Sequence, residues 1–406
     1  MALAPAVLVV LALSVSGCGG NDPERAGTDP IPGTKLTVYS SMPGEGPERE
    51  VGRAVERGAA LAIAERRGRA GRYSVTFRPL DAGEGSESRS RSNGRRAVQD
   101  TTAVGYIGEL DSQLSKITVP QQNNAGVAQI GPTNTYTGLT RGGPGAEPGD
   151  PDKYYPTGVR TFARLVPNDA VQGEALAAAA RDAGCRRVRI WRSNTAYGQG
   201  LADGVESVAG PTGIEVAGTE EVKPQQPSYA RQAEAIDADC LVWTGEPQTS
   251  GVQVLNDAAE GNAALRMFAG NAHCTAGALD ATGGISSAAA ERLRCTLPVV
   301  EPESGPGADL LERYRERHGD GGVEDAYALY GYEAMAVLLD AIERAGRDGT
   351  ISRAEVSEAV YELGNRNGPL GQYAIDSEGD VETATFGLYR IVRGELELEK
   401  TVEPAG

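Results

Sequence analysis

The sequence is poor in the residue types on which many enzyme active sites depend. Among 406 residues it has two histidines, His273 and His318, and aromatic side chains make up only 5% of the chain. It also lacks the G-x-x-x-x-G-K-[ST] phosphate loop, the H-E-x-x-H zinc motif and the G-x-S-x-G nucleophile turn. These absences remove the parts that hydrolase and metalloenzyme mechanisms need, so we expect no catalytic residues and no enzyme.

The two remaining hints of a cofactor or metal are weak. Gly44 and Gly46 follow the first predicted strand, but Arg49 stands where the dinucleotide fingerprint has its third glycine. His273 lies beside Cys274, and adjacent residues rarely share one metal ion. We therefore predict neither a cofactor nor a metal site.

Positive charge is also scarce. The chain carries 39 Lys and Arg against 56 Asp and Glu, a formal net charge of −17. This excess argues against nucleic acid and anionic membrane surfaces as direct partners. The length suits two domains, and a hydrophobic content of 40% is enough to build their cores.

The N-terminal segment is typical of an exported protein. Residues 1–17 carry no charge and are largely apolar, but they are too few to span a bilayer. Val15-Ser16-Gly17-Cys18 resembles the bacterial lipobox, so residues 1–18 are expected to be a lipoprotein signal with a lipid on Cys18. The alternative is an ordinary secretory signal that contains a cysteine. The lack of Lys or Arg before the apolar run leaves open a start codon upstream of Met1.

A segment rich in proline, glycine and charge follows this signal. Residues 19–33 have little to bury and are predicted to form a flexible tether. With the lipid on Cys18, this organisation places the folded body outside the cytoplasm and anchored to the cell membrane.

The most informative stretch covers residues 104–140. Short apolar runs at 104–107 and 127–130 predict buried parallel strands, and helical spacing between them predicts the crossover. The loops 108–112 and 131–135 must then emerge at the carboxyl edge of the sheet, where open α/β sheets bind ligands. They carry hydrogen-bonding side chains without a proton-transfer partner, namely Glu109, Asp111, Ser112, Thr133, Asn134 and Thr135. We expect them to hold a small polar ligand.

Structural alternatives exist for these loop residues. Ser112 stands at the start of the predicted helix, where free N–H groups favour an anion, but it could be a plain N-cap. Thr133 and Thr135 could be turn residues after Pro132.

The same β-α alternation occurs twice along the chain. It predicts an α/β fold with two doubly wound parallel-sheet lobes. Residues 81–93 (DAGEGSESRSRSN) are interpreted as a polar loop. Near the end, FGLYRIV and ELELEKTV flank Arg393-Gly394, which predicts a hairpin.

Four cysteines remain in the folded part, and an exported protein can keep disulfides. Cys185 and Cys240 each lie just before a predicted strand, and these strands should be neighbours in a doubly wound lobe. We therefore predict a Cys185–Cys240 bridge, which leaves Cys274 with Cys295. The alternative is four free buried thiols.

Several segments, in shared order, resemble the substrate-binding proteins of branched-chain-amino-acid-type ABC transporters, which have the type I periplasmic-binding-protein fold. The matching segments are GAALAIAE, AVQD with VGYIGELDS, AGVAQIGPTNTYTGLT, FARLVPNDAVQG, NTAYGQG, DAYALYGYEAM and GPLGQYAIDSEGD. The resemblance implies two lobes joined by three crossovers around an enclosed ligand. We expect residues 34–162 with 298–384 in the first lobe, and 163–297 with 385–403 in the second.

The resemblance also implies where the ligand binds. By position, the loops that hold an amino acid's carboxylate and amino group contain Ser112 and residues 133–135, and the second lobe adds Tyr197, Glu246 and Asn271. Tyr197 could instead be a core aromatic at a helix start. Asp111 and Glu246 depart from the family pattern, so either could pair with a ligand ammonium group.

Three functions follow from these observations. The first is a monomeric receptor that captures a small amino-acid-like or carboxylate-bearing solute and delivers it to an ABC permease and its ATPase. The second is a sensor of the same fold that signals through a membrane partner. The third, an enzyme, has no visible catalytic constellation.

Overall fold

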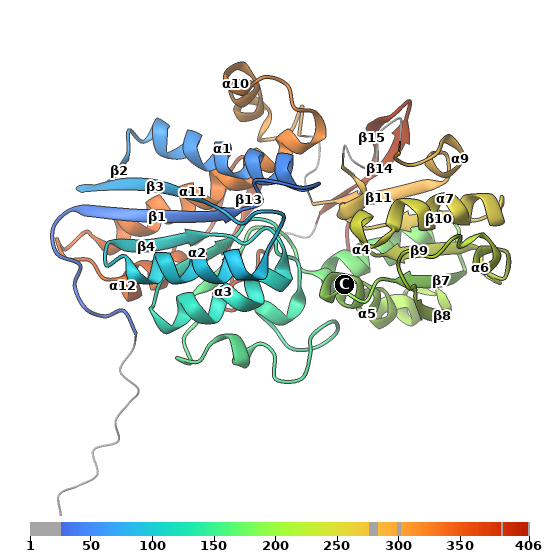
Figure 1. Cartoon of the computed structure of the whole chain (residues 1–406), viewed down its shortest axis with the longest axis horizontal. Coiled ribbons are helices and arrows are strands. Elements are labelled where there is room, and N and C mark those ends of the chain that lie inside the picture. The colour runs from blue at the N-terminus through green and yellow to red at the C-terminus, as the bar shows by residue number, and fades with distance from the viewer. Residues whose placement is uncertain (1–25, 276–282, 299–301, 383–384, 405–406) are drawn as a thin grey trace, which may run out of the picture.

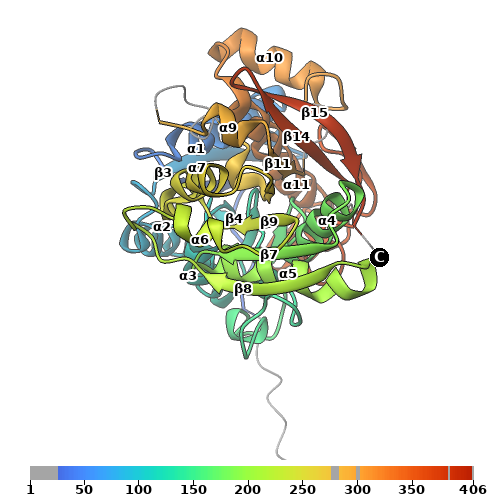
Figure 2. The same cartoon turned by 90° about the vertical axis from the view of Figure 1, so that its right-hand side faces the viewer.

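The computed structural model describes residues 26–275, 283–298, 302–382 and 385–404. The predicted signal and Cys18 lie outside these ranges. The described residues form two lobes side by side, each built on a mainly parallel sheet with helices on both faces (Figures 1 and 2). The chain passes between the lobes three times, after β6, after β11 and after β13. The predicted fold class is confirmed.

The first lobe contains a six-stranded sheet in the order β2-β3-β1-β4-β5-β6. Only β2 is antiparallel to its neighbour. Its strands are β1 Lys35–Met42, β2 Arg69–Ala70, β3 Tyr73–Asp81, β4 Ala103–Ile107, β5 Ala128–Gly131 and β6 Phe162–Arg164. Its helices are α1 Arg49–Glu65, α2 Glu87–Gln99, α3 Ser112–Asn124, α10 Ala308–His318, α11 Tyr327–Ala345 and α12 Arg353–Tyr361. Short turns η1 Thr137–Leu139, η2 Asp152–Tyr154 and η5 Gly322–Ala326 and the hairpin β12 Arg366–Gly368 with β13 Gly371–Tyr373 complete it.

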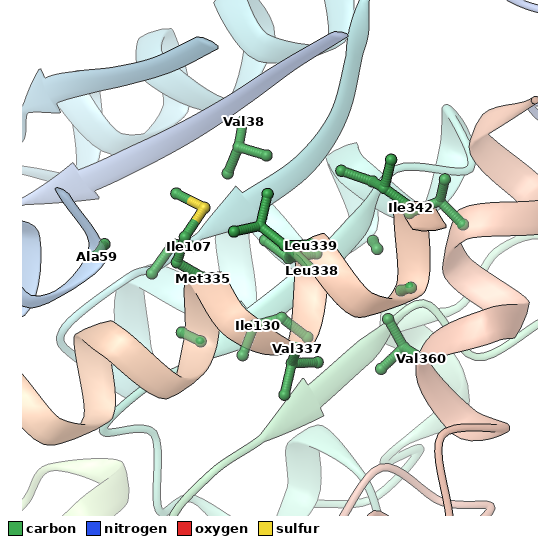
Figure 3. Close-up of a cluster of buried hydrophobic side chains, with 14 of the residues drawn as sticks. Val38, Ala59, Ile107, Ile130, Met335, Val337, Leu338, Leu339, Ile342 and Val360 are labelled. Atoms are coloured by element: carbon green, nitrogen blue, oxygen red, sulfur yellow. The ribbon is translucent and has the colours of Figure 1, made fainter. Parts of the chain in front are cut away.

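The core of this lobe follows the alternation of side chains along its strands. On β1, Val38 packs against α1 and α11, whereas Tyr39 packs against α2 on the other face. Figure 3 shows how Leu338 and Leu339 of α11 meet the strand residues Val38 and Ile107. Segments separated by about 300 residues in sequence therefore share one core.

The second lobe contains a seven-stranded sheet in the order β15-β14-β11-β10-β9-β7-β8. Its strands are β7 Arg187–Arg192, β8 Glu215–Glu221, β9 Cys240–Thr244, β10 Arg266–Ala269, β11 Leu293–Leu297, β14 Phe386–Val392 and β15 Glu395–Val402. Its helices and turns are α4 Asp169–Asp182, α5 Ala196–Thr212, α6 Ala230–Glu234, α7 Gly251–Gly261, α9 Ser287–Ala290, η3 Pro247–Thr249 and η4 Asn271–His273. Helices α4 and α5 cover one face of the sheet, and α6 and α7 cover the other.

Two disulfides tie this second lobe together. Cys185 pairs with Cys240 and Cys274 pairs with Cys295, as predicted. The first joins the starts of the neighbouring strands β7 and β9. The second links the segment after β10 to β11, so both bridges hold segments that flank adjacent strands.

A buried carboxylate connects two of the three crossovers. Asp380, just before the third crossover, forms an ion pair of 2.8 Å with the buried Arg164 at the end of β6. It also accepts hydrogen bonds from Thr140 and from Asn168, which lies in the first crossover. Thus a single side chain connects the two chain segments that enter the second lobe from the first, at the first and the third crossovers.

Two segments differ from the sequence-based expectation. The predicted polar loop at residues 81–93 is helical from Glu87, because α2 needs to bury only Ser90, Gly94 and Ala97. The described part of the predicted tether contacts the first lobe, since the Ile31 N–H donates to the Ile351 carbonyl at 2.7 Å and the Ile31 side chain is buried. The flexible tether stays a prediction for residues 19–25. No described helix is long and apolar enough to cross a membrane.

Candidate functional site

A cavity of about 210 Å³ lies between the lobes, at the carboxyl ends of strands from both sheets. The adjacent strands β4 and β5 pair in parallel, with Ile107 opposite Ile130, so the loops after them begin side by side. The second lobe supplies the segments after β7, β9 and β10. Seven of the nine residues predicted to hold the ligand line this cavity: Asp111, Ser112, Thr133, Thr135, Tyr197, Glu246 and Asn271.

The first-lobe wall is built around the start of α3. Asp111, not Ser112, is the N-cap, because its carboxylate accepts from the Gln113 N–H at 2.5 Å. The Ser112 hydroxyl instead accepts from the Tyr136 N–H at 3.2 Å and so joins the two loops. A negative side chain therefore already satisfies the positive end of this helix.

The loop after β5 is fixed by hydrogen bonds at its base. The Thr133 hydroxyl donates to the Leu110 carbonyl at 2.7 Å, and the Thr135 carbonyl accepts from the Asp169 N–H of the second lobe at 2.7 Å. Glu109 and Asn134 are the two predicted residues that do not line the cavity. The side chain of Asn134 is fully buried, and its amide donates to the Leu110 carbonyl at 3.3 Å.

The second-lobe wall presents a carboxylate and a tyrosine. Glu246 follows β9, and its two oxygens accept from the hydroxyls of Ser193 at 2.8 Å and Thr195 at 2.7 Å. Tyr197 donates to the Asn271 side-chain oxygen at 3.2 Å. Asn271 of the second lobe and Tyr327 of the first lobe both line the cavity.

The described wall is acidic. It includes the carboxylates of Glu48, Asp111, Glu246 and Glu324, and its described residues include no Lys, Arg or His. Burial raises the pKa of Glu246, with the Ser193 and Thr195 hydroxyls opposing the rise and the charge of Asp111 adding to it. Burial likewise raises the pKa of Asp111. A cationic group placed here would compensate buried negative charge.

Sequence reasoning missed several of the wall residues. Glu48 and Val51 come from the start of α1, Glu324 and Tyr327 come from the region before and at the start of α11, and Thr195 caps α5. Tyr327 lies within DAYALYGYEAM, which carried the family resemblance without an assigned role. Glu48 had no local signal, because only the packing of α1 brings it to the cleft.

The remaining chemistry of the cleft does not form a metal centre. No group of three or more His, Cys, Asp or Glu side chains that could hold a metal occurs among the described residues. His273 is buried, and burial lowers its pKa to about 3, so it is neutral and accepts from the Trp243 Nε1–H at 3.3 Å. Its neighbour Cys274 is in a disulfide, as expected.

The family described as periplasmic binding protein matches residues 40–395, which is most of the chain. The chain is a member of the periplasmic binding protein family. The resemblance inferred from the sequence is thereby confirmed. Because this is a family of binding proteins located outside the cytoplasm, the periplasmic binding protein described here is a solute receptor and not an enzyme.

Individual relatives agree with this assignment. Over 369 residues the protein is 23% identical to Leu/Ile/Val-binding protein homolog 1 of Brucella suis, covering 88% of this chain and 91% of the relative. A leucine-binding protein of Thermotoga maritima has the same fold, with a TM-score of 0.76, 22% identity and coverage of 91% and 99% of the two chains. An ABC transporter solute-binding protein of R. palustris, solved with benzoate, has a TM-score of 0.73, 17% identity and coverage of 92% and 97%.

Proposed function

We propose that this protein is the extracytoplasmic receptor of an ABC importer and that it recognises an amino-acid-like solute through an ammonium group. The observation that carries this proposal is the cavity wall, with four carboxylates and no basic side chain among its described residues. The names of its relatives, which include a leucine-binding protein and a benzoate complex, support the importer role but leave the ligand open.

The ammonium group of the solute would lie between Asp111 and Glu246. Hydrogen bonds to charged groups are stronger than neutral ones, and both carboxyls are largely removed from water. A ligand carboxylate at the start of α3 would instead lie beside Asp111, which already caps that helix. Ser112, Thr133, Thr135, Tyr197 and Asn271 would supply neutral hydrogen bonds.

Calorimetry with three ligands of similar size and different charge tests the proposal. We expect leucinamide, a cation, to bind more tightly than zwitterionic leucine, and benzoate to bind most weakly. Glu246→Gln should weaken leucinamide binding about tenfold or more, because it removes a charge-assisted hydrogen bond. Glu362→Gln, at an exposed carboxylate outside the cavity, is the matched control. Equal affinity of wild type and Glu246→Gln for leucinamide would contradict the proposal.

The same proposal includes a lipid on Cys18, a monomeric receptor and delivery of the solute to a permease and its ATPase. Closure of the lobes about the three crossovers would enclose the solute. The alternative role as a sensor gains no support, since none of the relatives reported above is named as one.

A further inference from the structure

A second and larger cavity lies beside the acidic one. Its volume is about 700 Å³, and it shares Thr133, Asn271 and Tyr327 with the acidic cavity. The acidic cavity is smaller than the range of about 300–1,000 Å³ that is usual for ligand pockets, whereas the second cavity lies within that range. The two cavities therefore adjoin at these three residues.

The walls of this apolar cavity come from both lobes. Leu311 of α10 and Tyr330 of α11 line it from the first lobe, and Leu297, Leu396 and Leu398 line it from the second. Leu396 and Leu398 lie on the same face of β15, and both are only half-buried. In Figure 1, α10 and the β14–β15 hairpin stand at the same end of the two lobes.

Among its described residues, this cavity is also lined by one basic side chain, Arg315, and by the carboxylates of Glu303, Asp320 and Glu395. Arg315 lines it, but its guanidinium pairs with Glu303 at 2.7 Å and with Asp325 at 3.0 Å. An anionic ligand group would have to compete with both carboxylates. The leucine and tyrosine walls therefore favour an uncharged, apolar occupant.

We infer that the solute is a cationic amphiphile, with its ammonium group in the acidic cavity and an aliphatic or aromatic tail in the apolar cavity. This inference rests on the proposed function of the acidic cavity. The adjacency of the two cavities at Thr133, Asn271 and Tyr327 assigns the apolar walls to the same solute. The alternative is that the apolar walls of the two lobes pack against each other when the lobes close.

A series of amino-acid amides with growing linear side chains tests the inference by calorimetry. Alaninamide, norvalinamide, norleucinamide and 2-aminooctanamide carry the same charge and differ in tail length. In the wild type, affinity should rise about threefold to fourfold per methylene, the equivalent of ~0.8 kcal/mol. The ratio of affinities for 2-aminooctanamide and norvalinamide should therefore be about fiftyfold.

Variants in the apolar wall separate a tail site from a closure surface. Leu398→Gln should reduce the ratio of the affinities for 2-aminooctanamide and norvalinamide at least threefold. Leu363→Gln, at a half-buried leucine outside both cavities, should leave this ratio unchanged. If Leu398→Gln weakens every amide by the same factor, the wall serves lobe closure and the inference is wrong. Binding of short amides without any dependence on length would also overturn it, whereas failure of all amides to bind would overturn the proposed function itself.

Discussion

At the scale of single residues, two acidic side chains in one loop have opposite roles. Asp111 lines the acidic cavity, while Glu109, two residues earlier, is fully buried behind it. The Glu109 carboxylate accepts from Ser41 at 2.7 Å, Ser90 at 3.0 Å and Tyr106 at 2.5 Å. The sequence analysis expected both side chains to face the ligand. A loop has no regular periodicity, so its sequence does not reveal which side chains turn inward.

Replacement of Glu109 should change how stability depends on pH. Burial raises the pKa of Glu109 to about 7, above the value of about 4.3 for an unfolded chain. Between these values the folded protein binds more protons than the unfolded one, so this group lowers stability as pH rises. Glu109→Gln removes this pH-dependent loss. Between pH 5 and pH 8, the free energy of unfolding of the variant should therefore rise by up to about 3 kcal/mol relative to that of the wild type.

Urea unfolding at pH 5, 6.5 and 8 measures this difference. Glu362→Gln, at a half-exposed side chain, should run parallel to the wild type. A constant difference between Glu109→Gln and wild type at all three pH values would show that Glu109 does not titrate in this window.

Among whole elements, those with a strong local pattern were predictable and those decided by packing were not. The hairpin β14–β15 turns at Arg393 and Gly394, whose φ angles of 56° and 82° suit the predicted two-residue turn. The first part of helix α2, residues 87–93, was assigned to a polar loop because all of its side chains are polar, so the apolar periodicity that marks a helix is absent there.

The two disulfides should differ in their contributions to the stability of the second lobe. Cys185–Cys240 closes a sequence separation of 55 residues and Cys274–Cys295 one of 21. In the chain-entropy model, replacing both cysteines of a bridge by serine should lower the free energy of unfolding by about 4 kcal/mol for the first bridge and by about 3 kcal/mol for the second. Urea unfolding of Cys185→Ser/Cys240→Ser and of Cys274→Ser/Cys295→Ser measures the two losses. A larger loss for the second pair would contradict the loop-length explanation.

At the scale of the whole molecule, the sequence predicted that two lobes enclose a ligand but not the extent of the space between them. The apolar cavity brings together α10, α11, β11 and β15, which have no common motif. Its walls depend on how the lobes sit against each other, and no local pattern encodes that arrangement. The strand-end loops were predictable because topology alone places them at one edge.

The net charge of the whole chain bears on how it stays at the cell surface. A charge of −17 gives no attraction to anionic lipid, so membrane retention would depend on the lipid on Cys18. We expect Cys18→Ser to move the protein from the membrane fraction to the medium, as immunoblots of fractionated cells would show. Retention of the variant in the membrane fraction would refute the predicted anchor.

The three passages of the chain between the lobes also determine the order in which the protein can be completed during synthesis. The first lobe needs Leu338 and Leu339 of α11 to fill the core around β1 and β4. The second lobe needs β14 to pair with β11, after the last helix of the first lobe has been made. The second lobe therefore cannot be completed until every described element of the first lobe has been made, and we expect the second lobe to be the last to reach its native state.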